Sequence, residues 1–171
     1  KLFNYNPKID KLYDTIINII SKTKNWQKLI EITDNAYKKK IIDKKIFTEN
    51  KSIALFEIAK IKYLTSLEES LKLIEQSLNL KEFFQPFVSF YIDILIACNS
   101  YNKAKKYLIK TWNHNSHPKL KDDIKKLSKA MKISYLEIAR SCKSNSNDEY
   151  ETKLLMTESF IDSKKWQEAR K

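Results

Sequence analysis

The sequence of 171 residues contains no glycine at all. Dinucleotide-binding fingerprints, phosphate-binding P-loops and two-residue β-hairpin turns need glycine at fixed positions, so these architectures are excluded. Proline is also scarce, with three residues in the chain. A chain with so few helix breakers is most easily built from helices that turn on Asn and Ser, and we expect an all-α fold.

Cysteine and long apolar runs are scarce as well. Cys98 and Cys142, the only two cysteines, match no metal-ligand spacing and form no disulfide framework. Each lies among apolar residues at helical spacing, so we expect two buried free thiols. No apolar run approaches the ~20 residues of a membrane span, and no signal peptide is visible. The sequence begins without Met and stops at Lys171 inside a new helix, so we expect a fragment of a longer protein.

Positive charge is in excess, with 33 Lys+Arg against 21 Asp+Glu and a net charge of +12. Such an excess raises the question of nucleic acid or an anionic membrane. However, Arg140 and Arg170 are the only arginines, although the planar guanidinium is preferred for phosphates and bases. The richness in Lys, Asn, Ile, Tyr and Phe also fits an AT-biased genome. A solvated lysine surface and an anionic partner both stay open.

Apolar residues recur at helical spacing and predict five helical hairpins in one helical-repeat domain, 1–171. The hairpins span about 8–42, 48–80, 85–113, 118–143 (a degenerate pair) and 148–171 (truncated), with 144–148 as a polar loop. Pro7 precedes the first helix, and Thr48 is the expected N-cap of the third. Apolar residues from Ile53 to Leu64 should form the core side of that helix. Ser66-Leu-Glu-Glu69 reads as a capping box for the next one.

Four segments share one pattern where the second helix of a hairpin should begin. They are Asn25-Trp-Gln-Lys-Leu29, Ser66-Leu-Glu-Glu-Ser70, Ser100-Tyr-Asn-Lys-Ala104 and Lys165-Trp-Gln-Glu-Ala169. Ser70 and Ala104 are 34 residues apart, which is the tetratricopeptide period. The longer interval from Leu29 to Ser70, 41 residues, predicts a loop from Lys40 to Phe47.

The repeated segments resemble tetratricopeptide repeats, which implies a right-handed superhelical array of antiparallel hairpins, an α-solenoid. In this register Val88, Tyr91, Ile92 and Leu95 take the packing positions of a first helix, opposite Ala104 of the second. The sequence departs from the family pattern in two ways. Lys or Asn replaces the usual turn glycine, and Leu29 replaces the small residue of the first unit.

A narrower resemblance rests on the middle and the end of the chain. Phe83-Phe-Gln-Pro86, Trp112, His117-Pro-Lys-Leu120 and Trp166-Gln-Glu-Ala169 resemble the carboxyl-terminal repeat region of HemY-type proteobacterial proteins. The resemblance implies a link to haem or porphyrin metabolism. It also implies association with the bacterial inner membrane through amino-terminal segments outside this sequence, with the repeats in the aqueous phase, expected on the cytoplasmic side. It brings no catalytic residue and no cofactor.

Few residues point to chemistry. His114 and His117 lie three apart, but no Cys, Asp or Glu accompanies them at ligand spacing, and His117 is explained by the turn before Pro118. We therefore predict no metal or haem site. No nucleophile–base pair or phosphate-binding loop is readable, so we do not expect an enzyme. An RNA reader would need a regular base-reading position, and none is visible.

The function that the sequence favours is recognition of a protein or peptide segment in the groove lined by the first helices of successive hairpins. The groove-facing positions in the repeat register are Lys11, Asp14, Asn18, Phe56, Lys60, Tyr63, Ser89, Asp93, Leu154 and Glu158. The alternative is contact of the lysine-rich segments 38–45 and 103–110 with an anionic membrane surface or nucleic acid.

Overall fold

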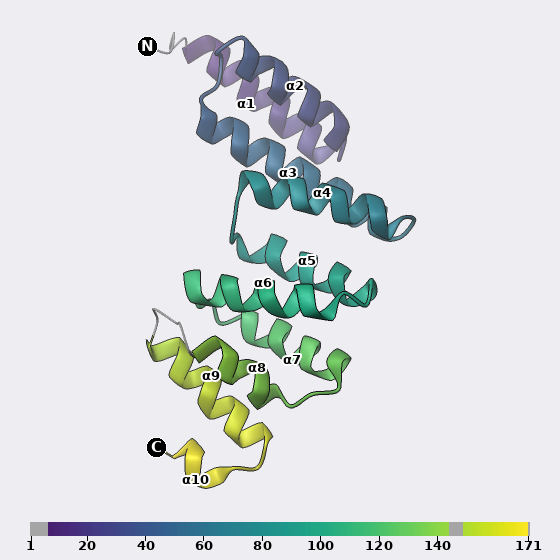
Figure 1. Cartoon of the computed structure of the whole chain (residues 1–171). Coiled ribbons are helices and arrows are strands. Elements are labelled where there is room, and N and C mark those ends of the chain that lie inside the picture. Colours follow the sequence, from purple (N-terminus) through teal and green to yellow (C-terminus); the bar gives the residue numbers. More distant parts are fainter. Residues whose placement is uncertain (1–6, 144–148, 171) are drawn as a thin grey trace. The chain divides into compact units, whose positions relative to one another are not determined.

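The computed structural model describes residues 7–143 and 149–170, and in these ranges the chain consists of ten α-helices without a β-strand (Figure 1). The helices are α1 Pro7–Lys22, α2 Trp26–Lys38, α3 Lys44–Tyr63, α4 Leu67–Leu80, α5 Gln85–Ala97, α6 Tyr101–His114, α7 Leu120–Met131, α8 Tyr135–Lys143, α9 Glu149–Asp162 and α10 Trp166–Ala169. The predicted all-α class is confirmed, and the loop predicted at 144–148 lies outside the described residues. The helices divide into two compact units, which meet in the sequence between Glu82 and Phe83.

In the first unit, α3 packs against both α2 and α4. Tyr13 of α1 joins a buried cluster with Ala36 of α2 and Ile42. The Tyr13 hydroxyl lies 3.3 Å from the Thr33 hydroxyl and accepts a hydrogen bond of 3.0 Å from Asn50 Nδ2. One tyrosine therefore connects α1, α2 and α3.

Small residues bring α4 close to α3. The Ser70 hydroxyl donates to the Ala59 carbonyl at 2.8 Å, and the Ser77 hydroxyl donates to the Ser52 carbonyl at 2.7 Å. All four residues are buried. These bonds satisfy hydroxyl groups that would otherwise be buried without a partner.

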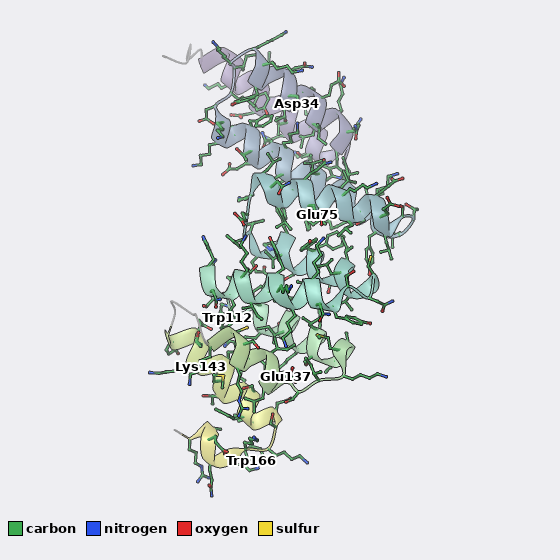
Figure 2. The ribbon with its side chains drawn as sticks, viewed as in Figure 1. Asp34, Glu75, Trp112, Glu137, Lys143 and Trp166 are labelled. Carbon is green, nitrogen blue, oxygen red and sulfur yellow. The ribbon has the colours of Figure 1, made fainter. Side chains whose placement is uncertain are left out.

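In the second unit, each helix packs against the next, and α5 also packs against α7 and α6 against α8. Contact with the next helix and the next but one is the arrangement expected of stacked hairpins. The predicted packing residues Val88, Tyr91, Ile92, Leu95 and Ala104 are all buried. Trp112, labelled in Figure 2, is fully buried in this core.

Residues other than glycine adopt the left-handed backbone conformation (positive φ) in the turns. Within the described ranges these are Lys24, Lys40, Phe83, Asn99, Lys132 and Lys164. At all of them except Phe83, the N–H of the following residue bonds a carbonyl five positions back, and the residue's own N–H bonds one three positions back. This is the hydrogen-bond pattern of a Schellman helix end, which usually carries glycine. The turns keep their geometry and carry the strain of a Cβ atom.

The four repeated segments all begin at the N-cap of a second helix. Asn25, Ser66, Ser100 and Lys165 are the N-caps of α2, α4, α6 and α10. In each, the cap carbonyl accepts from the backbone N–H four residues later, at 3.0 to 3.2 Å. The alignment made from the sequence is therefore confirmed as a structural equivalence of helix starts.

Two predicted helix ends are wrong. The second helix ends at Lys38 instead of Ile42, because the chain turns at Lys40 and buries Ile42, which is 3% exposed. The third helix starts at Lys44, because the Asp43 carboxylate caps the Ile46 N–H at 2.7 Å. Asp is preferred over Thr at an N-cap, which explains why Asp43 and not the predicted Thr48 begins this helix. The loop predicted from Lys40 to Phe47 is therefore shorter, 39–43.

The cysteines and tryptophans follow the predictions in part. Cys142 is a buried free thiol, and burial raises its pKa to about 12. Cys98 is also free but only half-buried. We also expected the tryptophans to pack within the hairpins; Trp112 is buried, but Trp166 is 57% exposed on the short helix α10.

Candidate functional site

The groove residues predicted on α1 lie on its exposed side. Lys11, Asp14 and Asn18 are all exposed, and their spacing places them on one side of the helix. Tyr13 fixes the rotation of α1, because its ring is buried in the cluster with Ala36 and Ile42. This side of α1 presents a cation, an anion and an amide to solvent.

The groove residues predicted on α3 form a more apolar surface. Phe56 and Tyr63 are half-buried and Lys60 is exposed. The Lys60 ammonium lies 2.6 Å from Glu57 Oε1 and 4.9 Å from the centre of the Phe56 ring. An exposed ion pair of this kind contributes only about 0–1 kcal/mol, so a partner's carboxylate can replace Glu57 at little cost.

Exposed aliphatic residues on α3 were not predicted. We expected Ile53, Ile61 and Leu64 on the core side, but they are 42%, 57% and 84% exposed. Of the residues predicted on the core side, Ala54, Leu55 and Ala59 are buried, and Ser52 joins them. Apolar residues occur on all sides of this helix, so their periodicity did not identify the buried side. The small residues on the core side were the available signal.

In the second unit, the predicted residues of α5 have partners on α7. The Ser89 hydroxyl accepts from Gln85 Nε2 at 2.7 Å and donates to the Asp123 carboxylate. Asp93 accepts from the Lys126 ammonium at 3.0 Å. Ser89 and Asp93, which lie one turn apart on α5, thus both bind side chains of α7.

Glu158 of α9 is bound to the same helix α7. Its carboxylate lies 3.2 Å from the Lys121 ammonium, which also lies 3.2 Å from Glu151 Oε2. Lys121 is 8% exposed, so its charge needs these two carboxylates. Leu154, also predicted for the groove, is half-buried. A segment bound along α5, α7 and α9 would therefore meet charges that already have partners.

The α7 residues of this network were missed by the sequence reasoning. Asp123 is 2% exposed, and this burial raises the pKa of its carboxyl group, against the lowering effect of the Ser89 hydrogen bond and the Lys126 charge. Asp122-Asp123 and Lys125-Lys126 were visible as charge pairs, but the degenerate repeat gave no register to orient them. The structure shows that Asp123 faces α5.

The two histidines have structural contacts. The His114 ring stacks on Phe83 with 4.1 Å between ring centres, and His117 Nδ1 accepts from the Lys119 N–H at 3.2 Å. Among the described residues there is no group of three or more His, Cys, Asp or Glu side chains that could hold a metal ion.

The two lysine-rich segments differ in their surroundings. In segment 103–110, Lys103 lies over the Tyr91 ring, Lys105 lies 3.4 Å from Glu137 Oε1, and Lys110 lies over the Phe83 ring. In segment 38–45, Lys38, Lys39, Lys40, Lys44 and Lys45 are exposed. None of these five makes an ion pair with a carboxylate of the described part of the chain.

A shallow depression lies between α8 and the turn from α9 to α10. Its volume is about 440 Å³, and it is lined by Ser134, Leu136, Glu137, Arg140, Ser163 and Lys165. Glu137 is bonded to Lys105 on α6. The lining of the depression combines two hydroxyl groups with one carboxylate and two cationic groups.

Comparison with known proteins yields no relative: no family model matches the chain, and no curated protein matches it. Across the described ranges, no helix has the length and hydropathy needed to cross a bilayer.

Proposed function

We propose that this chain is a tetratricopeptide-like α-solenoid that acts as a non-catalytic scaffold and binds a segment of a partner protein on the exposed sides of its first helices. The observation that supports this proposal is the repeated start of the second helices at Asn25, Ser66, Ser100 and Lys165. In arrays of such hairpins, first helices line the extended binding surface.

The exposed side chains of the first helices suit a partner segment that carries both apolar and charged side chains. Ile53 and Leu64 give α3 an exposed aliphatic surface, whereas Asp93 and Glu158 carry charges on α5 and α9. Apolar side chains of a partner would supply affinity, and its charged groups would supply specificity by exchanging with the existing ion pairs.

The experiment is affinity capture of partners by the tagged protein from the cell that makes it, followed by a comparison of variants. Lys60→Glu combined with Asp93→Lys should abolish capture, because both first-helix charges reverse. The control is Lys28→Glu with Glu31→Lys, which exchanges an exposed ion pair of 2.9 Å on the second helix α2. Unchanged capture by the first pair of substitutions contradicts the proposal.

A second control separates binding from local damage. Asp93→Lys removes the ion pair with Lys126, and adding Lys126→Asp restores a pair of reversed polarity. If capture depends on the surface charges, the restored pair does not rescue it. Rescue by Lys126→Asp indicates that only the local structure had been disturbed.

The narrower resemblance leads to a more specific proposal, a HemY-like role in haem or porphyrin metabolism at the bacterial inner membrane. The residues that carry it have structural contacts: Trp112 is buried, and Leu120 begins α7 in the core. These contacts are those of packing residues, so the proposed role rests on the sequence resemblance alone. Deletion of the gene should cause porphyrin intermediates to accumulate, and an unchanged porphyrin profile would exclude this role while leaving the scaffold proposal intact.

A further inference from the structure

The turn between α2 and α3 carries a concentrated positive charge. The lysine turn, defined as Lys38, Lys39, Lys40, Lys44 and Lys45, places five exposed ammonium groups within eight residues. Elsewhere in the first unit, Lys28, Lys51, Lys60, Lys62 and Lys72 each lie within 2.9 Å of a carboxylate. Lys11, Lys22 and Lys24 form no ion pair in the described ranges, but they do not make a cluster of five. The nearest acid in sequence, Asp43, is engaged as the N-cap of α3. Asp43 can therefore offset at most one of the five positive charges of the lysine turn.

Two of these lysines lie where a helix disfavours them. Lys44 and Lys45 open α3, whose first turn contains no acidic residue. The amino-terminal end of a helix is the positive end of its dipole, so cations there are destabilising. The Asp43 carboxylate at the N-cap offsets part of this cost, but Lys44 and Lys45 themselves form no ion pair in the described part of the chain. Residues that break a local rule are expected at functional sites.

The lysine turn is also held in one conformation. Ile42 is buried in the cluster with Tyr13 and Ala36. Tyr37 and Phe47, on either side of the turn, stack with 4.3 Å between ring centres. The ammonium groups are thus presented from a fixed backbone, which lowers the entropy lost on binding.

Exposed aliphatic residues continue from the lysine turn along α3. The α3 stripe consists of Ile46, Ile53, Ile61 and Leu64, which are 38%, 42%, 57% and 84% exposed. Ile46 directly follows Lys45, and Leu64 caps the other end of the helix. At about 1.5 Å per residue, the stripe is ~27 Å long. Its spacing of seven, eight and three residues places the four side chains on one side of α3, where the apolar side of a helix from another protein can pack.

We infer that α3 docks an amphipathic helical segment of the partner protein, with its apolar side on the α3 stripe and a cluster of Asp or Glu residues against the lysine turn. This inference rests on the proposed scaffold function and specifies the partner's chemistry. Charge complementarity and the adjoining apolar stripe together select this occupant.

Other anionic occupants fit less well. Glu49 lies on the same side of α3 as the stripe, and an anionic bilayer laid along the whole helix would repel its carboxylate, whereas Glu57 is paired with Lys60. The first unit contains no arginine, and Tyr37 already uses one ring face in its stack with Phe47. Both facts disfavour a nucleic acid, which would be bound by Arg forks and free aromatic rings.

The test uses the full chain and a fluorescent synthetic helix with leucines on one side and four glutamates at one end. Two matched peptides replace the glutamates with Gln or scramble the leucines. Fluorescence anisotropy at low and high salt measures binding to the wild type, to Ile53→Asp and to Lys39→Gln/Lys44→Gln/Lys45→Gln. Lys28→Gln on α2 serves as the control variant.

The acidic peptide should bind about tenfold more tightly than either matched peptide at low salt, and this preference for glutamate should fade as salt rises. Both α3 variants should lose about tenfold in affinity, whereas Lys28→Gln should lose none. The double variant Lys44→Gln/Lys45→Gln, which leaves Lys39 at the C-cap of α2 in place, should also unfold at a higher urea concentration, because it removes cations from the positive end of α3. If the lysines only supported the fold, their removal would lower stability. A gain in stability together with a loss of binding therefore indicates a role in binding.

Equal binding of the matched peptides overturns the inference. So does tighter, lysine-dependent binding to phosphatidylserine vesicles or to single-stranded RNA under the same conditions. If the α3 variants still capture the native partner from cells while variants of other first helices do not, the scaffold function stands and the role of α3 fails.

Discussion

The indole Nε1 of Trp112 donates a hydrogen bond of 3.2 Å to the Thr152 hydroxyl, which connects α6 to α9 within the second unit. Both residues are buried, and Trp112 has no exposed surface. The indole N–H, the one polar group of Trp112, therefore has its acceptor on a helix of another hairpin. The hydrogen bond between Trp112 and Thr152 is thus a sensitive probe of the packing between hairpins.

Thr152→Val should destabilise the protein by about 1–3 kcal/mol, because it leaves a buried indole N–H without an acceptor at nearly constant volume. Trp112→Ala should cost more, about 3–5 kcal/mol, because it leaves a large cavity. Urea unfolding followed by circular dichroism measures both. Thr152→Ser keeps the hydroxyl and is the control. A Thr152→Val variant as stable as the wild type would show that the hydrogen bond contributes nothing.

The second prediction concerns the stability of the turns that lack glycine. Lys132 has φ 56° and ψ 36° at the end of α7, where a Cβ atom is strained by about 1–2 kcal/mol. Lys132→Gly should stabilise the protein by about 0.5–1 kcal/mol, after the larger entropy of glycine in the unfolded chain is counted. Lys129→Gly, in the last helical turn, should destabilise by a similar amount. A less stable Lys132→Gly variant contradicts this account.

Asp123 predicts a pH dependence with a definite sign. Burial raises the pKa of its carboxyl group in the folded protein, so folding favours the protonated form. Its contribution to stability is therefore fully present below the unfolded pKa and is lost as the pH rises through the folded pKa. Asp123→Asn removes this loss, so its stability relative to the wild type should increase with pH.

Unfolding free energies of the wild type and Asp123→Asn, measured from about pH 3 to 7, test this sign. Ser89→Ala removes a hydrogen bond that lowers the pKa of Asp123, so the stability of this variant should fall more with rising pH than that of the wild type. A difference that shrinks with rising pH would mean that the ionised carboxylate is stabilised by Ser89 and Lys126 more than burial disfavours it.

Close packing at the repeated small position gives a fourth prediction. Ala104 is fully buried in the register shared with Ser70, so Ala104→Leu should overpack the α5–α6 contact and cost about 1–3 kcal/mol. Asn102→Leu on the exposed side of α6 is the matched control and should be near neutral. Equal stability of the two variants would contradict the shared register.

The sequence predicted the hairpins well because their signals are local. The helix starts at Asn25, Ser66, Ser100 and Lys165 were predicted from one repeated sequence pattern, and the structure confirms them; the side chains of Asn25 and Ser66 also cap their helices. The prediction failed at Asp43, where two cap candidates competed and the stronger one lay five residues before Thr48. Local competition of this kind is decided by the whole turn, including the burial of Ile42.

The exposed surface was harder to predict than the core. Ile53, Ile61 and Leu64 are exposed because the small residues Ser52 and Ala59 turn the opposite side of α3 toward α4. Hydrophobicity alone does not distinguish these two sides. The partners of Asp93 and Glu158 were also missed, because both lie on α7 in the repeat with the weakest signature. That the groove positions bind a partner stays a prediction.

The most direct test of recognition by the first helices is photo-crosslinking from single positions in the intact protein. A photoreactive amino acid is placed at the exposed residues Asn18 or Ile53 of first helices, or at the exposed residues Gln76 or Asn102 of second helices. The scaffold account predicts that a partner protein is crosslinked from Asn18 and Ile53 and not from Gln76 and Asn102. Equal or stronger crosslinking from the second-helix positions would contradict it.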